Sequence, residues 1–201
     1  MGLHHSKKSR NKRASSAEGK GKGKGKKYLP TNGHTCNGHI VAPARDPLEH
    51  APKITEPQKA MVLESWQIIQ EDISKVGVVM FMKLFETHPD VQDVFYPFKG
   101  QSSDDLKYSS QLKSHALRVM GTVEKCLARI NDPKKLVELL HDLGARHVMY
   151  NARVDYIDLI GPQFIWAIQP VVGDKWTPEL EQAWSDVFKF ISHIMKEAMT
   201  F

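Results

Sequence analysis

The stretches LKSHALRVM (residues 112–120) and LHDLGARHV (residues 140–148) decide how this chain is interpreted. Each carries a histidine inside a helical pattern of apolar residues, His115 in the first and His147 in the second, 32 residues apart. Leu143 stands one turn before His147 and therefore shares its helix face. The sequence thus predicts that the His147 imidazole points into apolar space.

His115 has similar neighbours. Leu112 precedes it by three residues and Val119 follows it by four, so an imidazole and branched aliphatic side chains share one helix face. Taken singly, a histidine on an apolar helix face is more often a core residue that makes its hydrogen bonds within the protein than a metal ligand. Among the other histidines, His88 stands before a proline at a helix end and His141 stands beside an acidic residue. Both look like surface residues.

The same helical periodicity continues through the chain from residue 54 onwards. No alternation typical of strands competes with it, and no repeat of 20–50 residues is visible. Helix starts are indicated where a capping residue has a proline close behind it, at Thr55, Asp132 and Thr177. The predicted fold class is therefore all-α. The expected helices start at residue 55, cover about 72–87 and about 104–130, start again at 132, cover about 156–172, and start at 177.

Several classes of chemistry are excluded by this pattern. The dinucleotide-binding folds need alternating strands and helices, which the chain lacks. It also has no glycine-rich phosphate loop and no cysteine cluster that would bind a metal. Any chemistry must therefore come from a bound cofactor, or the chain has none.

Charge divides the chain of 201 residues into two parts. Residues 1–53 contain 12 Lys or Arg and 3 Asp or Glu, a net charge of +9, whereas residues 54–201 contain 16 and 20, a net charge of −4. The first part includes the repeat GKGKGKGKK (residues 19–27) and almost nothing that a core would bury. We therefore expect a disordered basic leader over 1–53 and one folded domain over 54–201.

The leader begins with a lipidation motif. Gly2 and Ser6 in M-G-x-x-x-S fit N-myristoylation after removal of the methionine. One acyl chain binds membranes only marginally, and a basic patch on an anionic surface would add to it. A solvated basic tail, a nuclear-localisation signal or a nucleic-acid arm is the alternative. The basic residues behind the motif are Lys7, Lys8, Arg10, Lys12 and Arg13.

The two cysteines, Cys36 and Cys126, lie in different settings and do not form a disulfide framework. The first residues lack the apolar core of a secretory signal, and no apolar run approaches the ~20 residues of a membrane-spanning helix. We expect an intracellular protein, peripheral on the cytoplasmic face of a membrane, or alternatively cytosolic. We expect Cys126 to be a buried, unreactive thiol.

The whole of residues 54–201 resembles the globins, and among them neuroglobin and the membrane-bound globin X group. The strings that carry the likeness come in the globin order and at approximately the globin distances. The resemblance implies the globin fold, in which helices pack around a haem pocket. The strings are ESW at Trp66, GVVMFMKLFETHPDVQDVF, SHALRVM, LGARHV, KWTP, and AW at Trp184.

The resemblance also implies which residues contact haem b (iron protoporphyrin IX). His147 resembles the proximal iron ligand and His115 the distal histidine, which makes these two the expected metal ligands. Phe95 resembles the aromatic at the corner after the short third helix. Arg118 and Arg146 are candidates for the propionates, with a solvated surface charge as the alternative for each. The full expected set is Phe81, Phe95, Phe98, His115, Arg118, Val119, Leu143, Arg146 and His147.

The function implied is reversible binding of oxygen or another diatomic gas, with His115 and His147 both on the iron, for sensing, scavenging or redox protection at a membrane. A haem redox enzyme is the alternative, such as a nitric oxide dioxygenase, a nitrite reductase or a peroxidase-like protein. The chain has no flavin or nicotinamide domain, so such an enzyme would need an external reductase. A helical interaction module without haem is a third class, and nucleic-acid binding is not expected.

Overall fold

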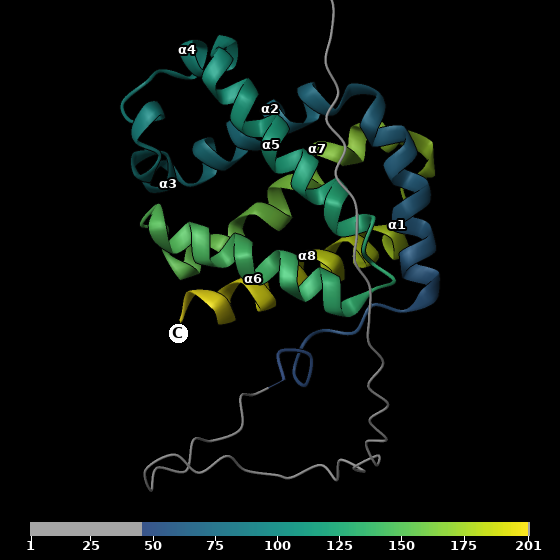
Figure 1. Ribbon diagram of the computed structural model, residues 1–201. Coiled ribbons are helices and arrows are strands. Elements are labelled where there is room, and N and C mark those ends of the chain that lie inside the picture. The colour runs from purple at the N-terminus through teal and green to yellow at the C-terminus, as the bar shows by residue number, and fades with distance from the viewer. Residues whose placement is uncertain (1–45, 201) are drawn as a thin grey trace, which may run out of the picture. The chain divides into compact units, whose positions relative to one another are not determined.

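The computed structural model describes residues 46–200. The expectations for Gly2, for the basic cluster behind it and for Cys36 fall outside these residues. Within the described part the chain is helical and has no strand, as the all-α prediction states (Figure 1). In that same part, no helix combines the length and the apolar character needed to cross a membrane. The helices are α1 (Glu56–Ile69), α2 (Ile73–Thr87), α3 (Pro89–Val94), α4 (Ser103–Tyr108), α5 (Ser110–Leu127), α6 (Pro133–Met149), α7 (Ile160–Val172) and α8 (Pro178–Met199).

Three of these helices start at the predicted caps. Thr55 forms a capping box with Gln58, since each side chain accepts a hydrogen bond from the backbone N–H of the other. Asp132 caps α6 by accepting from the N–H of Lys135. Thr177 caps α8 in the same way, and all three helices have proline at one of their first two positions. The predicted helix starts are confirmed.

Two predicted helices differ from those observed. The helix expected over 104–130 is divided into α4 and α5 at Ser109, whose backbone is extended and whose side chain caps α5. The helix expected from 156 starts as a 3₁₀ helix, η3 (Val154–Leu159), and becomes α-helical at Ile160. Pro162 favours this boundary, because it has no N–H to donate to residue 158 and is best tolerated in the first turn of α7, where no intrahelical donor is needed.

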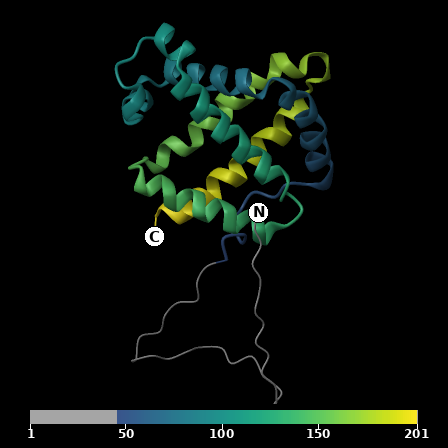
Figure 2. The ribbon, with the colours of Figure 1, turned by 45° about the horizontal axis from the view of Figure 1, so that its top comes forward.

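The helices pack in crossing pairs around one core (Figure 2). The most extensive pairs are α6 with α8, α2 with α5 and α2 with α7. Trp184 of α8 is fully buried, and its indole Nε1 donates to Ser65 Oγ of α1 at 3.0 Å. Its ring centroid lies 4.9 Å from that of Phe164 in α7. Ahead of α1, Leu48 and Ala51 also pack against this core.

Glycines allow two of these crossings to be close. A Cβ atom on Gly77 of α2 would lie 3.1 Å from the Cβ of Ala116 and 3.0 Å from Met120 Cγ, both on α5. A Cβ atom on Gly144 of α6 would lie 2.5 Å from the carbonyl oxygen of Met195 in α8. The backbones of α2 and α6 can therefore approach their partners more closely than any side chain would permit.

Candidate functional site

A cavity of about 230 Å³ lies between α2, α3, α5, α6, η3, α7 and α8. Its walls are mainly apolar, and both histidines of the predicted ligand pair line it. The structure therefore brings together side chains that are far apart in the sequence. Of the nine predicted site residues, those that line the cavity are Phe81, Phe95, His115, Val119, Leu143 and His147.

His147 comes from the last turn of α6 and is half-buried. Its Nδ1 lies 2.8 Å from the carbonyl oxygen of Leu143, one turn earlier. Because a carbonyl oxygen can only accept, Nδ1 carries the proton and donates. The neutral ring then has its free lone pair on Nε2. A metal-binding histidine usually has this arrangement, in which the second ring nitrogen donates to a carbonyl and fixes the ring.

His115 comes from the second turn of α5 and is also half-buried. Phe81 and Phe95 pack edge-on against its ring, with centroids at 5.0 and 5.3 Å. The pKa of His115 falls from 6.5 to about 4, mainly because the ring is buried, with smaller contributions from the positive charge of Arg118 and from His147 when that ring is protonated. The His115 ring is therefore neutral at physiological pH, as a metal ligand or a hydrogen-bond donor to a neutral ligand needs to be.

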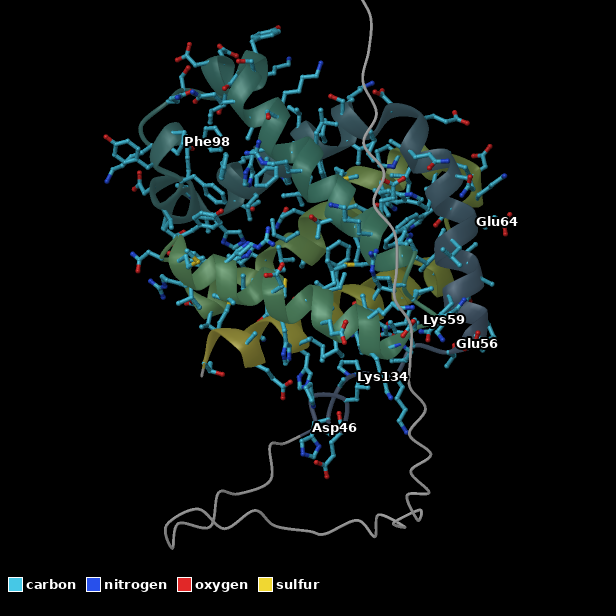
Figure 3. The ribbon with its side chains drawn as sticks, viewed as in Figure 1. Asp46, Glu56, Lys59, Glu64, Phe98 and Lys134 are labelled. Atoms are coloured by element: carbon cyan, nitrogen blue, oxygen red, sulfur yellow. The ribbon has the colours of Figure 1, made fainter. Side chains whose placement is uncertain are left out.

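Phe98 belongs to the wall behind the cavity. Its ring stacks on Phe95 at 5.9 Å and lies 6.0 Å from Phe85, and it does not line the cavity itself (Figure 3). Its side chain is buried. Phe98 therefore supports Phe95 from behind.

Both predicted arginines lie at the surface. Arg146 is exposed and pairs with Asp142 at 2.6 Å on the outer face of α6. Arg118 is exposed, donates to Ser114 Oγ at 3.0 Å, and approaches His115 Nδ1 at 3.4 Å. Neither lines the cavity. The Arg118 side chain approaches the site at His115, and its carbonyl oxygen accepts from Oγ1 of Thr122, which lines the cavity.

The sequence did not indicate the wall formed by the segment between α6 and α7. Tyr150 and Tyr156 of this segment line the cavity. Tyr156 Oη donates to Asp90 Oδ2 of α3 at 2.7 Å, across 66 residues of chain. Local patterns carry no signal for a contact of this kind. Cys126 also lines the cavity, and it is buried as predicted, with a pKa raised by that burial to about 12.

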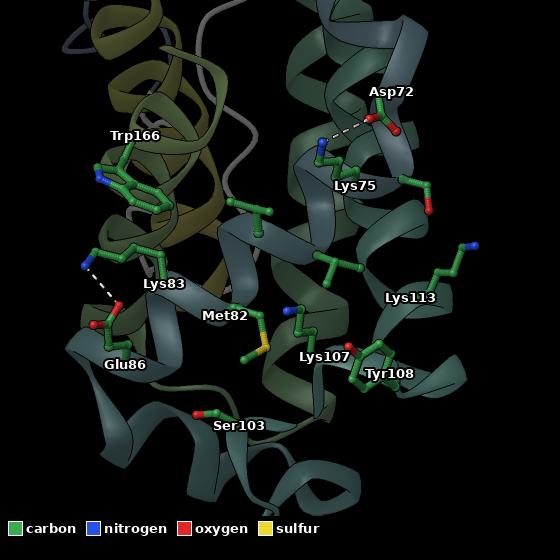
Figure 4. A pocket seen from close by; sticks show the side chains of 13 residues that line it. Asp72, Lys75, Met82, Lys83, Glu86, Ser103, Lys107, Tyr108, Lys113 and Trp166 are labelled. Atoms are coloured by element: carbon green, nitrogen blue, oxygen red, sulfur yellow. Dashed lines mark hydrogen bonds and ion pairs between the residues drawn. The ribbon is translucent and has the colours of Figure 1, made fainter. Parts of the chain in front are cut away.

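A second hollow, of about 750 Å³, lies on the outer side of α2, between α4 and α7 (Figure 4). Its rim carries the ion pairs Lys83–Glu86 at 2.9 Å and Lys75–Asp72 at 3.8 Å. Trp166 stands at one end, with Lys83 Nζ 5.1 Å from its ring. None of the residues that line this hollow is a histidine or a cysteine. The smaller cavity is therefore the candidate site for a metal-containing cofactor.

The residues of the smaller cavity fit haem. An apolar lining suits the macrocycle, and two imidazoles from different helices suit an iron that accepts one ligand on each face. The cavity is smaller than the roughly 300–1,000 Å³ of most ligand pockets. Tyr150 at its mouth is 73% exposed, so a large flat group would extend outward through this opening.

The chain is similar to several known proteins. The family model Globin matches residues 78–195, more than half of the chain. The neuroglobin of Chaenocephalus aceratus is 25% identical over 146 residues, which cover 72% of this chain and 92% of that protein. The anaerobic nitrite reductase GLB0 of Physcomitrium patens is 26% identical over 166 residues, covering 81% and 92%.

A solved structure has the same fold. It is the hexacoordinated heme protein from an anhydrobiotic tardigrade, with a TM-score of 0.70 at 20% sequence identity. The alignment covers 75% of this chain and 97% of that one. From the extent of the family match, this chain belongs to the globin family.

Proposed function

We propose that this globin binds haem b in the cavity between α5 and α6, where His147 and His115 are the residues that would hold its iron. The observation that carries the proposal is that these two imidazoles, from different helices, line one apolar cavity. When bound, the iron supplies affinity for a diatomic gas and the ability to exchange an electron. His147 is prepared for coordination by its Nδ1 hydrogen bond to Leu143, which leaves the Nε2 lone pair free.

His115 has two roles in this proposal. Its neutral ring either offers a lone pair to the iron, giving a six-coordinate centre, or donates a hydrogen bond to a gas ligand. Exogenous ligands then compete with His115. The similarity to neuroglobin and to a tardigrade protein described as hexacoordinated supports the six-coordinate form. The function that follows is reversible binding of oxygen or another diatomic gas, for sensing, scavenging or redox protection.

A haem redox enzyme is the second candidate function. The observation that favours it is the similarity to a plant globin named as an anaerobic nitrite reductase. Such an activity would draw electrons from an external reductase. Anaerobic mixing of the reduced protein with nitrite separates the two functions. Sustained turnover with a reductant favours the enzyme, whereas a single slow oxidation favours the binding protein.

We further propose that the chain is held at the cytoplasmic face of a membrane by a myristoylated Gly2 and the basic residues behind it. The sequence motif and the net charge of +9 over residues 1–53 support this. Flotation of wild-type and Gly2→Ala protein from cells with anionic membranes tests it. Equal membrane association of the two proteins would contradict acylation as the anchor.

The visible spectrum of the purified, dithionite-reduced protein tests haem binding. We expect sharp, split bands for the wild type, a single broad band for His115→Ala, and no haem absorbance for His147→Ala. His141→Ala is the matched control, because His141 lies on the same helix as His147 but does not line the cavity. A folded wild-type protein that takes up no haem would contradict the proposal.

A further inference from the structure

One side of the cavity is closed by a single hydrogen bond between two walls. The first wall is α3, which contributes Val91 and Val94 to the lining. The second wall is the segment from Tyr150 to Leu159 between α6 and α7, which contributes Tyr150 and Tyr156. Tyr156 Oη donates to Asp90 Oδ2 at 2.7 Å and so joins the two walls. Both views of the ribbon place α3 beside the end of α6, at one edge of the molecule (Figures 1 and 2).

Neighbouring charges hold Tyr156 in place for this bond. The Arg153 guanidinium lies 4.8 Å from the centre of the Tyr156 ring. Asp155 fixes that guanidinium with two hydrogen bonds, from Nε at 3.1 Å and from a terminal nitrogen at 2.6 Å. The hydrogen bond to Asp90 raises the pKa of Tyr156 above its usual value, so the phenol remains a donor at every physiological pH.

On this side the cavity walls also reach the protein surface. Tyr150 is 73% exposed and Val94 is 37% exposed, although both line the cavity. Apart from the six-residue helix α3, the other walls are made by longer helices, whereas the segment after Tyr150 contains a residue with positive φ, Asn151 at 57°, and the short 3₁₀ helix η3. Short 3₁₀ segments have poorer hydrogen-bond geometry than α-helices and open more easily. The segment from Tyr150 to Leu159 is therefore the wall that can move.

We infer that Asp90 and Tyr156 form a clasp that controls the passage of haem between α3 and the segment Tyr150–Leu159. The inference rests on the proposed function, since it concerns the same cavity and the same cofactor. The clasp joins exposed groups, so its net contribution is small and water can replace it. It must break for the two walls to separate. Removing it lowers the barrier for haem moving in either direction.

The experiment measures haem release and haem uptake in the full chain. Release is followed as loss of Soret absorbance when the haem-loaded protein is mixed with an excess of an apoprotein that captures haem. Uptake is followed by stopped flow, with carbonmonoxy-haem mixed into the haem-free chain. We expect Tyr156→Phe to raise both rate constants by a similar factor, roughly three- to tenfold. The ratio of the two rate constants therefore stays unchanged.

A second variant and a control make the result specific. Asp90→Ala removes the acceptor and should give the same acceleration, and the double variant Asp90→Ala/Tyr156→Phe should be no faster than either single variant. Tyr96→Phe is the control, because Tyr96 is exposed, does not line the cavity, and its hydroxyl makes no hydrogen bond within residues 46–200. Both of its rate constants should equal those of the wild type.

Three outcomes would overturn the inference. Additive effects in the double variant would show that the two residues act separately. Faster release with unchanged uptake would show that the bond only stabilises the loaded protein and does not govern passage. Unchanged rates in Tyr156→Phe, with an intact Soret band, would contradict the clasp alone. A wild-type protein without a Soret band would contradict the proposed function, and the clasp with it.

Discussion

His115 Nδ1 lies 3.4 Å from a terminal guanidinium nitrogen of Arg118, one turn further along α5. A guanidinium can only donate, so Nδ1 must accept, and the proton of the neutral ring then resides on Nε2. In this tautomer Nε2 can donate to a ligand, but it has no lone pair for a metal. For His115 to coordinate iron through Nε2, the proton has to move to Nδ1, where it faces Arg118.

The first prediction is that Arg118 favours the five-coordinate form, in which His115 does not coordinate the iron. Replacing Arg118 with Met leaves His115 Nδ1 free to carry the proton. In the reduced protein the ratio of six-coordinate to five-coordinate haem should therefore rise about two- to threefold. The visible spectrum measures this ratio, and carbon monoxide should bind more slowly. Arg146→Met is the control, because Arg146 pairs with Asp142 outside the cavity. An unchanged or smaller six-coordinate fraction would show that Arg118 does not set the tautomer.

The second prediction concerns stability in mild acid. The native pKa of His115 is about 4, below the usual 6.5, so the unfolded chain binds this proton more readily. The free energy of unfolding therefore falls as the pH drops from about 6.5 towards 4. The stabilisation that results from the lowered pKa of His115 is fully present above pH 6.5. Urea unfolding of the haem-free chain at several pH values measures the slope. In His115→Gln the slope over this window should be smaller, and an equal slope in both proteins would contradict the assignment.

The third prediction concerns the crossing of α6 and α8. Gly144→Ala would place a Cβ atom 2.5 Å from the backbone carbonyl of Met195, and backbone cannot easily move aside. We expect a loss of about 1–3 kcal/mol in the free energy of unfolding. Gly121→Ala on α5 is the matched control, since nothing lies within 4 Å of its Cβ position and alanine favours helix. It should stabilise the protein by about 0.5–1 kcal/mol, as urea unfolding would show.

The fourth prediction concerns the thiol in the cavity wall. Burial raises the pKa of Cys126 to about 12, so almost no thiolate forms at neutral pH. In a Cys36→Ser background, iodoacetamide should leave the native protein unmodified at pH 7.5 and alkylate Cys126 once urea unfolds it. Mass spectrometry counts the adducts. Rapid alkylation of the folded protein would mean that Cys126 is accessible and reactive.

Sequence patterns predicted those features whose partners are close in the chain. The Thr55 capping box needs a donor and an acceptor three residues apart, and both are visible in the sequence. The location of Arg146 at the surface follows from helix geometry as well, because a residue adjacent to His147 is turned by about 100° around the helix. Ser109 is a single capping residue without a proline behind it, which indicates a helix start only weakly. The sequence therefore predicted one helix over about 104–130, and the division at Ser109 was missed.

Such local patterns could not predict contacts between segments that are distant in the sequence. His115 and His147 were placed in one pocket only through the resemblance to globins, because no rule of spacing brings two helices together. Phe98 was expected at the haem, but the packing of Phe95 and Phe85 around it places it behind the cavity wall. The hydrogen bond between Asp90 and Tyr156 depends on how α3 meets the end of α6, which only the folded chain determines.

Gly77 has a consequence for how this pocket can evolve. It allows α2 to rest on Ala116, the residue directly after His115. A side chain at position 77 would meet Ala116 Cβ at 3.1 Å and Met120 Cγ at 3.0 Å, so one that these neighbours do not accommodate would displace α5 and the His115 imidazole with it. Gas affinity could then be tuned by a substitution that touches neither the ligand nor the cofactor, and selection on ligand binding would act on a position buried in a helix crossing.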